Sequence, residues 1–378
     1  MFFNDCGHVA KPQIVTHLRV FQNSGLSRSY ANRFNRLAGT GKSFDVRLGL
    51  FFQDAYGASH ILKPICDGES EGFFTNGDDA TLQRAWAREN GLAKTASLAE
   101  ILLTQIEHHR TEVFYNLDPM LYDATFVRQL PGCVRVKLAW RAAPGTINFA
   151  GYDRVVSNFP SIRAQYERQG IATAELFPGH DKALEPYATQ RERRVDVVFC
   201  GGFTRHHLKR RAILESVAAL GHRYRVVYHL DSSRLTKLAD SPLGWVGPLA
   251  KMRQPKSIRS AAAKPVFGTQ MYQALGNAKI VLNAAIDMAG DDRGNMRCFE
   301  AMGAGATLLT DGGNYPSGME AESTMLVYND PQDAAVKIIE CLEGRMWDAI
   351  AQKGHQMVKT LYSKEHQYEQ FLGILDDI

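Results

Sequence analysis

The amino-acid sequence predicts an α/β protein made of two doubly wound parallel sheets, each in a Rossmann-like domain. Three observations support this fold class. Apolar, β-branched stretches of strand length alternate with amphipathic helical stretches in both halves of the chain. A chain of 378 residues exceeds a comfortable single core. The polar and charged stretch 183–194 has the composition of a linker between the two halves.

The first half of the chain defines a domain at residues 1–182. Its strands are expected from apolar or alternating runs, and its helices from apolar residues spaced three and four apart. In order, we expect a strand at 14–21, a helix within 27–39, a strand at 45–52, a helix near 80–90, a helix at 98–110, strands at 112–117, 133–140 and 152–158, and a helix at 160–170.

The second half defines a domain at residues 195–345, followed by a helical tail at 346–378. The same patterns predict its elements. In order, we expect a strand at 195–202, a helix within 203–221, a strand at 223–230, a helix from residue 267, strands at 279–283 and 306–310 with a short helix between them, a strand at 325–330 and a helix at 331–344.

Composition narrows the class of protein. A net charge of +4 is mildly basic, which favours anionic ligands or a phospholipid surface, and it falls far short of the dense basic stripe of a nucleic-acid binder. The six cysteines are scattered without a CxxC pair, so neither a zinc ribbon nor a disulfide framework is indicated. The sequence shows no secretory signal and no apolar run of about 20 residues. We expect a cytoplasmic protein that is either soluble or peripheral at the inner face of the membrane.

The stretch 279–313 carries the strongest signal for a ligand site. It runs strand, glycine-bearing loop, helix, strand, and Asn295 is a natural N-cap for the helix. Arg297 and Glu300 share one side of that helix. In open α/β sheets, ligands bind past the carboxyl ends of the strands, where a helix N-terminus offers N–H groups and a positive dipole to phosphate. We therefore expect Arg297 and Glu300 at the ligand end.

A second phosphate-binding signal opens the second domain. Gly201 and Gly202 end its first strand and lead into a basic helix start, where Arg205 and either Lys209 or Arg210 are candidates for binding a diphosphate. His206 and His207 lack a third ligand at usable spacing, so we expect no bound metal.

The residues of this stretch resemble those of a known family. Asp292-RGNMRCF-Glu300 is similar to the pair of glutamates, separated by seven residues, in GT-B glycosyltransferases of the group 1 type, with the first glutamate shortened to aspartate. The strings AKIVLN and NMRCFEAMGAGATLLTD are closer to the spore-maturation-protein-B-like (CgeB-like) branch. The resemblance implies two Rossmann-like domains facing a central cleft, and a C-terminal helix that returns to the first domain.

The resemblance also implies roles for individual residues. Glu300 would bind the ribose hydroxyls of a sugar nucleotide, Asp292 would reach the donor sugar, and the backbone from Gly294 through Asn295 to Met296 would face the diphosphate. Further positions are implied at the nucleobase for Gly247, beside Trp245 and Val246, and at the acceptor side of the cleft for Ser24 and Gly25.

Catalytic groups in the first domain stay open at this point. Arg141 follows Trp140 at about the place where group 1 enzymes often carry a histidine. Asp54 and His60 follow the expected strand 45–52, and either Asp54 or His60 is expected to face the cleft. A general base would mark an inverting reaction, and Asp54, His60 and Asp118 are the candidates for it.

The expected function is that of a hexosyltransferase-like glycosyltransferase. It would move a sugar from a UDP- or GDP-sugar to an unidentified acceptor, which can be a glycan, a lipid, a protein or a small molecule. We expect no metal, and the group 1 resemblance implies retention of anomeric configuration. Two alternatives are a sugar-nucleotide epimerase with the same fold and a catalytically inactive sugar-nucleotide-binding protein.

Overall fold

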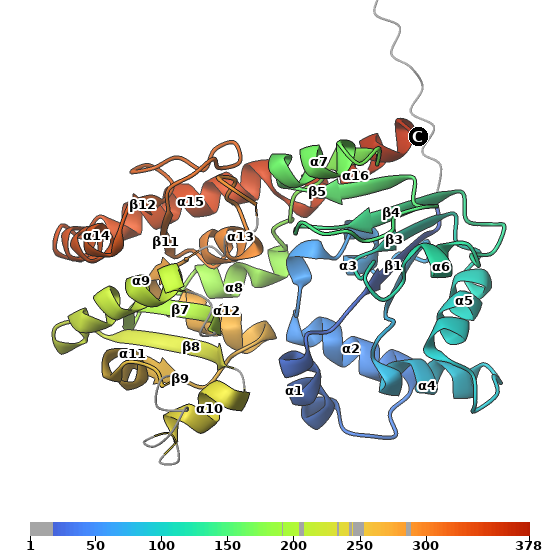
Figure 1. The fold of residues 1–378 in the computed structure, drawn as a ribbon, viewed down its shortest axis with the longest axis horizontal. Helices are drawn as coiled ribbons and strands as arrows, with labels where there is room; N and C mark the ends of the chain where they lie inside the picture. Colours follow the sequence, from blue (N-terminus) through green and yellow to red (C-terminus); the bar gives the residue numbers. More distant parts are fainter. Residues whose placement is uncertain are drawn as a thin grey trace, which may run out of the picture.

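A computed structural model describes residues 18–190, 192–203, 208–232, 234–241, 244, 253–284 and 289–378. The chain forms two α/β lobes that lie side by side, each built on a six-stranded parallel sheet (Figure 1). The predicted fold class of two doubly wound parallel sheets is confirmed. Within the described residues, no helix combines the length and apolar character needed to cross a bilayer.

The first lobe contains the sheet β2-β1-β3-β4-β5-β6. All neighbouring strands are parallel, so their carboxyl ends share one edge, with Ser24 paired beside Asn76. The chain order reverses next to β1, and such a switch point opens a crevice at the strand ends. The strands are β1 Val20–Ser24, β2 Gly72–Asn76, β3 Val113–Asn116, β4 Val136–Trp140, β5 Arg154–Ser157 and β6 Thr173–Glu175.

The second lobe contains the sheet β12-β11-β10-β7-β8-β9, again parallel throughout. Its switch point lies between β7 and β10, so both strands deliver their following loops to the same crevice. The strands are β7 Val195–Phe203, β8 Val226–Ser232, β9 Ala262–Ala263, β10 Ala278–Leu282, β11 Thr307–Asp311 and β12 Leu326–Tyr328.

Helices cover both faces of each sheet (Figure 1). The α-helices are α1 Arg28–Ala38, α2 Phe44–Asp54, α3 Lys63–Cys66, α4 Ala80–Glu89, α5 Leu98–His108, α6 Ala124–Val127, α7 Pro160–Glu167, α8 Glu185–Ala188, α9 Leu208–Ala218, α10 Arg234–Asp240, α11 Lys256–Ala261, α12 Gly268–Gly276, α13 Met296–Gly303, α14 Pro331–Glu343, α15 Trp347–Leu361 and α16 Lys364–Asp376. Short 3-10 turns lie at Ala58–His60, Lys182–Leu184 and Ala219–His222.

Strand alternation builds the core of the second lobe. Val198 and Val281 face one side of the sheet and pack with residues of α12, α13 and α15, whereas Val197 and Ile280 face the other side and pack with α9 and α14. Because both faces are covered, the strands are apolar throughout, as expected for a parallel sheet.

The prediction of a strand at 45–52 was wrong, because this segment is part of helix α2. The Ser43 hydroxyl accepts from the N–H of Val46 and caps the helix. The buried side chains Phe44, Arg47 and Phe51 are spaced three and four apart, as on one helix face. Arg47 explains the misreading, because it is only 1% exposed although it is charged.

Arg47 forms a buried ion pair with Asp79, the N-cap of α4. Its Nε and Nη2 donate to the two carboxylate oxygens at 2.9 and 3.1 Å, and Nη2 also donates to Asn35. Arg47→Lys should lower the free energy of unfolding by about 1–2 kcal/mol, because lysine cannot reproduce the planar two-pronged geometry. Urea denaturation measures this. Arg36→Lys on the exposed side of α1 is the control, and an equal loss in both variants would contradict the assignment.

Several further elements escaped the sequence patterns, among them strands β2 and β6. Strand β2 lies in a segment rich in glycine and polar residues, and the short strand β6 precedes the turn at 178–181. The expected linker contains the short helix α8, and Arg193 near its end donates to the carbonyls of Gly276 and Ala278 in the second lobe.

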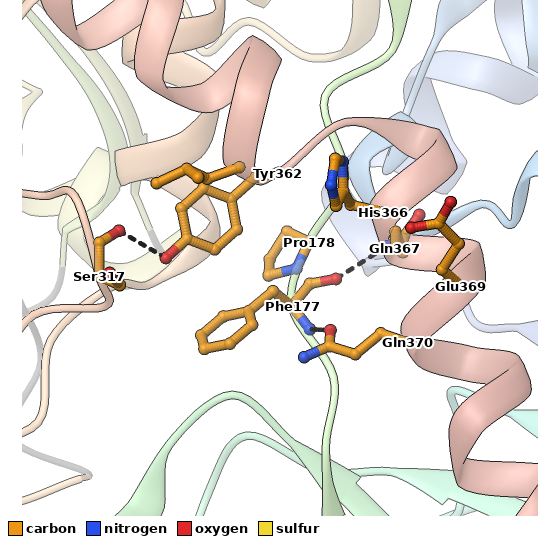
Figure 2. Close-up of a pocket in the computed structure, with 9 residues that line it drawn as sticks. Phe177, Pro178, Ser317, Tyr362, His366, Gln367, Glu369 and Gln370 are labelled. Carbon is orange, nitrogen blue, oxygen red and sulfur yellow. Dashed lines mark hydrogen bonds between the residues drawn. The ribbon is translucent and has the colours of Figure 1, made fainter. Parts of the chain in front are cut away.

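The tail crosses between the lobes, as expected. Helix α15 packs on α13 and β11 of the second lobe, whereas α16 lies on the first lobe (Figure 1). The buried ammonium of Lys364 donates to the carbonyls of Ala58 and Ile61 at 2.7 and 2.6 Å. At the joint between α15 and α16, a surface cavity of about 400 Å³ borders Phe177, whose carbonyl accepts from Gln367 (Figure 2).

Candidate functional site

Three adjoining cavities lie between the two lobes at the carboxyl ends of the strands, and all three are lined by Met296 at the start of α13. The first-lobe cavity, about 360 Å³, is lined by Ser24, Gly25, Asp78 and Asp118 among others. The central cavity, about 300 Å³, is lined by Trp140, Asn158, Arg210, Asp292 and Gly294 among others. The second-lobe cavity, about 200 Å³, is lined by Gly201, Gly202, His229, Arg297 and Glu300 among others.

Glu300 lies in the wall of the second-lobe cavity. Helix α13 buries it to 4% exposure, and Arg297, one turn earlier, donates to Oε2 at 2.7 Å. The Tyr272 hydroxyl donates to Oε1 at 3.4 Å. Each carboxylate oxygen can accept two hydrogen bonds, so each keeps an acceptor site for a ligand hydroxyl. Arg297 and Glu300 both line this cavity, and their contact with a ligand stays a prediction.

Arg297 and Glu300 each stabilise the charged form of the other. Burial raises the pKa of Glu300, and the guanidinium of Arg297 acts in the opposite direction. Burial acts to lower the pKa of Arg297, but the Glu300 carboxylate outweighs it and the net shift is upward. Arg297 therefore remains charged, and the cavity wall holds a carboxylate already paired with a cation.

The N-terminus of α13 opens into the central cavity. Asn295 occupies the predicted N-cap position, but its side chain does not cap the helix. Its amide instead donates to Asn283 Oδ1 at 3.4 Å. Gly294 precedes it with a φ of 98°, and a Cβ there would lie 2.7 Å from the Pro316 ring. The backbone N–H groups of Gly294 and Asn295 donate to the Cys298 sulfur. The helix end borders the central cavity at Met296, and its first turn can offer backbone N–H groups to an anion there.

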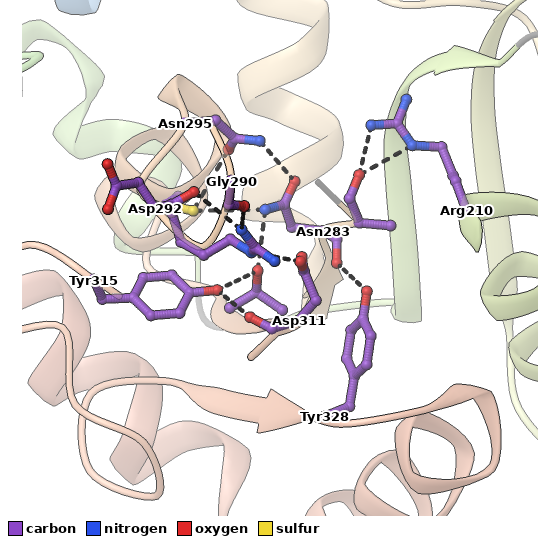
Figure 3. A network of polar contacts seen from close by, with 12 residues as sticks. Arg210, Asn283, Gly290, Asp292, Asn295, Asp311, Tyr315 and Tyr328 are labelled. Atoms are coloured by element: carbon purple, nitrogen blue, oxygen red, sulfur yellow. Dashed lines mark hydrogen bonds and ion pairs between the residues drawn. The ribbon is translucent and has the colours of Figure 1, made fainter. Parts of the chain in front are cut away.

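Arg210 brings a positive charge to the same cavity. Its guanidinium donates twice to the carbonyl of Ala284, at 3.0 and 2.5 Å (Figure 3). It also donates once to the carbonyl of Gly202, at 2.6 Å. These bonds join the ends of β7 and β10. Among the described residues, no carboxylate forms an ion pair with Arg210. Burial lowers its pKa without removing its charge.

Asp292 lines the central cavity and bridges the two lobes. Its Oδ2 accepts from the backbone N–H of Ser161 at 2.6 Å, in the first turn of α7. The Ser161 hydroxyl donates to the carbonyl of Ala289 at 2.8 Å, and Asn158 donates to the carbonyl of Gly294 at 2.7 Å. The loop before α13 is thus bound to the first lobe through three hydrogen bonds.

The structure describes only some of the remaining second-lobe candidates. Gly201 and Gly202 line the second-lobe cavity at the end of β7. Lys209 is exposed in the first turn of α9. Arg205 and Gly247, together with Trp245 and Val246, lie outside the described residues. The sequence did not single out His229 and Asp231, which line the same cavity after the middle of β8.

Some of the first-lobe candidates line the cavities between the lobes, and others do not. Ser24 and Gly25 line the first-lobe cavity at the end of β1, and Asp118 lines it as well. That this cavity is the acceptor side stays a prediction. His60 lines both the first-lobe and central cavities, and burial lowers its pKa to about 3. Asp78, which no sequence pattern indicated, also lines the first-lobe cavity.

Asp54 and Arg141 do not line these cavities. Asp54 is buried at the end of α2, where Arg33 donates to both its oxygens, at 2.6 and 3.1 Å, and Thr269 of the second lobe donates at 3.3 Å. Arg141 donates to the carbonyls of Ala143 and Pro144 in its own loop. In this structure, Asp54 holds α2 against the second lobe instead of facing the cleft.

One group of side chains outside the cleft has potential metal ligands. His180 and His355 approach the Glu185 carboxylate at 2.9 and 3.3 Å in the linker region. Lys359 also contacts this carboxylate, at 3.2 Å. Burial acts to raise the pKa of Glu185, but the hydrogen bonds from His180 and Lys359 prevail and lower it to about 2. The ammonium repels a cation, so this group is best described as an ion-pair network.

Two facing doubly wound lobes, with a cleft at the carboxyl ends of both sheets, define the GT-B fold of glycosyltransferases. The particular resemblances are distant. Residues 205–373 match the family model described as "Glycosyl transferase-like". A search of curated proteins found no significant match.

Solved structures match over nearly the whole chain. Anabaena HepE, solved with UDP and glucose, has 12% sequence identity and a TM-score of 0.61, with 96% of this chain and 100% of that one covered. The structure of the same protein with UDP-glucose has 13% sequence identity and a TM-score of 0.58, with 95% of this chain and 99% of that one covered. A glycosyltransferase from Rickettsia africae ESF-5 has 11% sequence identity and a TM-score of 0.54, with 95% of this chain and 98% of that one covered. At these identities the likeness concerns the fold.

Proposed function

We propose that the protein transfers a sugar from a nucleotide-sugar donor to an acceptor within the cleft between its lobes. The observation that carries this proposal is the arrangement of the three cavities around Met296. A buried carboxylate suited to ribose hydroxyls borders one cavity. The next has a cation and a helix N-terminus without a side-chain cap, both suited to a diphosphate, and the third opens on the first lobe.

The donor is proposed to occupy two cavities. The Glu300 carboxylate would accept from the ribose hydroxyls, and the nucleobase would lie towards Gly201 and Gly202. The diphosphate would lie between Arg210 and the N–H groups of the first turn of α13, with Asp292 beside the sugar. Arg205, Lys209 and Gly247 remain candidates for the same ligand. The UDP and UDP-glucose named with HepE make these the first donors to test.

The proposed reaction breaks the bond between the anomeric carbon and the diphosphate oxygen. A new bond forms from that carbon to an acceptor oxygen. The nucleoside diphosphate carries away the bonding electron pair, and its departing oxygen accepts the proton that the acceptor hydroxyl loses. Negative charge therefore grows on the diphosphate in the transition state. Arg210 and the α13 N-terminus are positioned to stabilise it, which is the role a metal ion has in other transferases. We propose a reaction without metal.

Finer features belong to the same proposal. They include a hexosyl donor, retention of anomeric configuration, membership of the spore-maturation-protein-B-like branch, and an acceptor that is a glycan, lipid, protein or small molecule. We also propose the domain limits 1–182 and 195–345, the linker 183–194, the tail 346–378, and a location in the cytoplasm or at the inner face of the membrane.

The test begins with binding. UDP and UDP-glucose should raise the melting temperature, with a stabilisation that grows as the logarithm of ligand concentration over the dissociation constant, whereas glucose alone should not. UDP-glucose should then release UDP, faster when an acceptor is present. The reaction should persist in EDTA. Formation of an epimeric nucleotide sugar without acceptor would instead support an epimerase, and binding without any turnover would support an inactive binding protein.

A further inference from the structure

The first-lobe cavity has an unusual wall. Two carboxylates, Asp78 and Asp118, line it, together with aromatic side chains that include Tyr56, Phe74 and Trp140. Among the described residues lining it there is no lysine or arginine. The cavity is therefore acidic and aromatic, in contrast to the central cavity, which contains Arg210 and Arg293.

The two carboxylates lie on either side of the turn after β1. Asp78 Oδ2 accepts from the N–H of Leu26 at 2.8 Å. A Cβ on Gly25 would lie 2.7 Å from Asp118 Oδ2, so the absent side chain leaves room for this carboxylate. The carboxyl ends of β1, β2 and β3 thus bring the two groups together, at the switch point of the first sheet.

Asp78 lacks the partners that a buried carboxylate normally has. Its Oδ1 is buried and has no hydrogen-bond partner in the described part of the chain. The neighbouring Asp79, by contrast, is fully paired with Arg47. Burial raises the pKa of Asp78, the hydrogen bond from Leu26 opposes this, and the charges of Asp118 and Asp79 add to the rise, with a net pKa of about 6. Such an arrangement destabilises the folded protein, so a ligand that completes it gains binding energy.

The chemistry of this wall selects its ligand. An ionised carboxylate only accepts hydrogen bonds, so its partner must be a donor, and a phosphate or carboxylate ligand would be repelled. Trp140 lines both this cavity and the central one, with its ring centroid 4.5 Å from that of His60. An aromatic face beside acceptor oxygens suits a ring with an apolar face and several hydroxyls.

We propose that the first-lobe cavity holds the acceptor as an uncharged, hydroxyl-bearing sugar ring, whose hydroxyls donate to Asp78 and Asp118 while the ring rests against Trp140. This inference rests on the proposed function and specifies its acceptor. It excludes acceptors that present a phosphate or carboxylate group at this position.

The first test compares acceptors in the wild-type protein. Methyl glucosides, galactosides and mannosides are assayed with UDP-glucose against glucuronic, galacturonic and mannuronic acid. At least one neutral sugar should become glycosylated, and its uronic acid should be at least about tenfold poorer in kcat/KM, from the loss of about 1.4 kcal/mol or more. Turnover that no neutral sugar accelerates, or preference for the acids, would overturn the inference. Failure to bind or turn over any nucleotide sugar would instead overturn the proposed function.

The second test uses Asp78→Asn, whose amide oxygen keeps the bond to Leu26. The KM for the neutral sugar should rise about tenfold while the dissociation constant for UDP stays unchanged. Asp118→Asn should act in the same direction. The exposed Asp376→Asn on α16 is the matched control. An unchanged acceptor KM in both site variants would overturn the assignment.

Stability provides a readout that a merely structural role would not give. The titratable groups around Asp78 are Asp79, Asp118, Tyr56 and Tyr122. Because the folded protein raises the pKa of Asp78, its contribution to stability is present at low pH and is lost as pH rises through about 6. Asp78→Asn should therefore raise the melting temperature at pH 7.5 and leave it unchanged near pH 4. A lower melting temperature at pH 7.5 would contradict the unpaired carboxylate.

Discussion

Glu300→Gln is expected to weaken UDP binding by at least about 100-fold. Two charge-assisted hydrogen bonds from ribose hydroxyls would become one neutral bond, and each charged bond contributes about 1.5–3 kcal/mol. Calorimetric titration measures the dissociation constant. The neighbouring Arg297 would lose its counterion in a buried site, so the free energy of unfolding should fall as well. Titrations therefore need to be run well below the melting temperature of the variant.

A modified nucleotide separates lost recognition from lost stability. UDP lacking the 2′ and 3′ hydroxyls should bind the wild-type protein about as weakly as UDP binds Glu300→Gln, and the variant should not distinguish the two nucleotides. Glu320→Gln, at an exposed position, should bind both like the wild type. Equal binding of the two nucleotides to the wild-type protein would show that this carboxylate does not contact ribose.

Local sequence signals predicted the second lobe well. Around Asn295, the apolar runs, the N-cap residue and the helical spacing of apolar side chains all indicate the same strand, glycine loop and helix. The structure places β10, α13 and β11 within a residue or two of the expected limits. Arg297 and Glu300 were predicted at the ligand end on the same grounds, and they line the second-lobe cavity.

The first lobe was less predictable because its decisive contacts are distant in sequence. The run DVRLGLFF is apolar enough for a strand, and only the buried pair of Arg47 with Asp79, 32 residues later, shows which face of helix α2 is buried. Strand β2 is hidden among glycine and polar residues, so Asp78 at its end was not recognised as a site residue. Asp54 was expected in the cleft only because α2 was taken for a strand.

The side-chain roles at the central cavity also required the fold. Nothing in the sequence separates Lys209 from Arg210 as the inward cation, since both follow the glycine pair at similar distance. The structure separates them: Arg210 is 8% exposed and donates to the ends of two strands, whereas Lys209 is exposed. A guanidinium can make these backbone bonds and keep further N–H groups for a ligand, because it has five donors.

Arg210→Met is expected to lower kcat/KM for UDP-glucose by about 10³-fold, which corresponds to about 4 kcal/mol of transition-state stabilisation. Charge on the departing diphosphate grows during the reaction, so the loss should be larger for turnover than for binding. Arg210→Lys keeps the charge but not the bonds to Ala284 and Gly202, and should recover part of the activity. Arg211→Met, at the neighbouring exposed position, should retain full activity.

The backbone bonds of Arg210 require a control for folding. If Arg210→Met only disordered the ends of β7 and β10, the affinities for uridine and for UDP would fall by the same factor, because the nucleoside site also borders Gly202. If the guanidinium acts on the diphosphate, uridine should bind the variant as it binds the wild type, and only the phosphate-bearing ligand should lose affinity. Equal losses of affinity for uridine and for UDP would show that Arg210 serves only to join two strands. The positive charge for catalysis would then come from another residue.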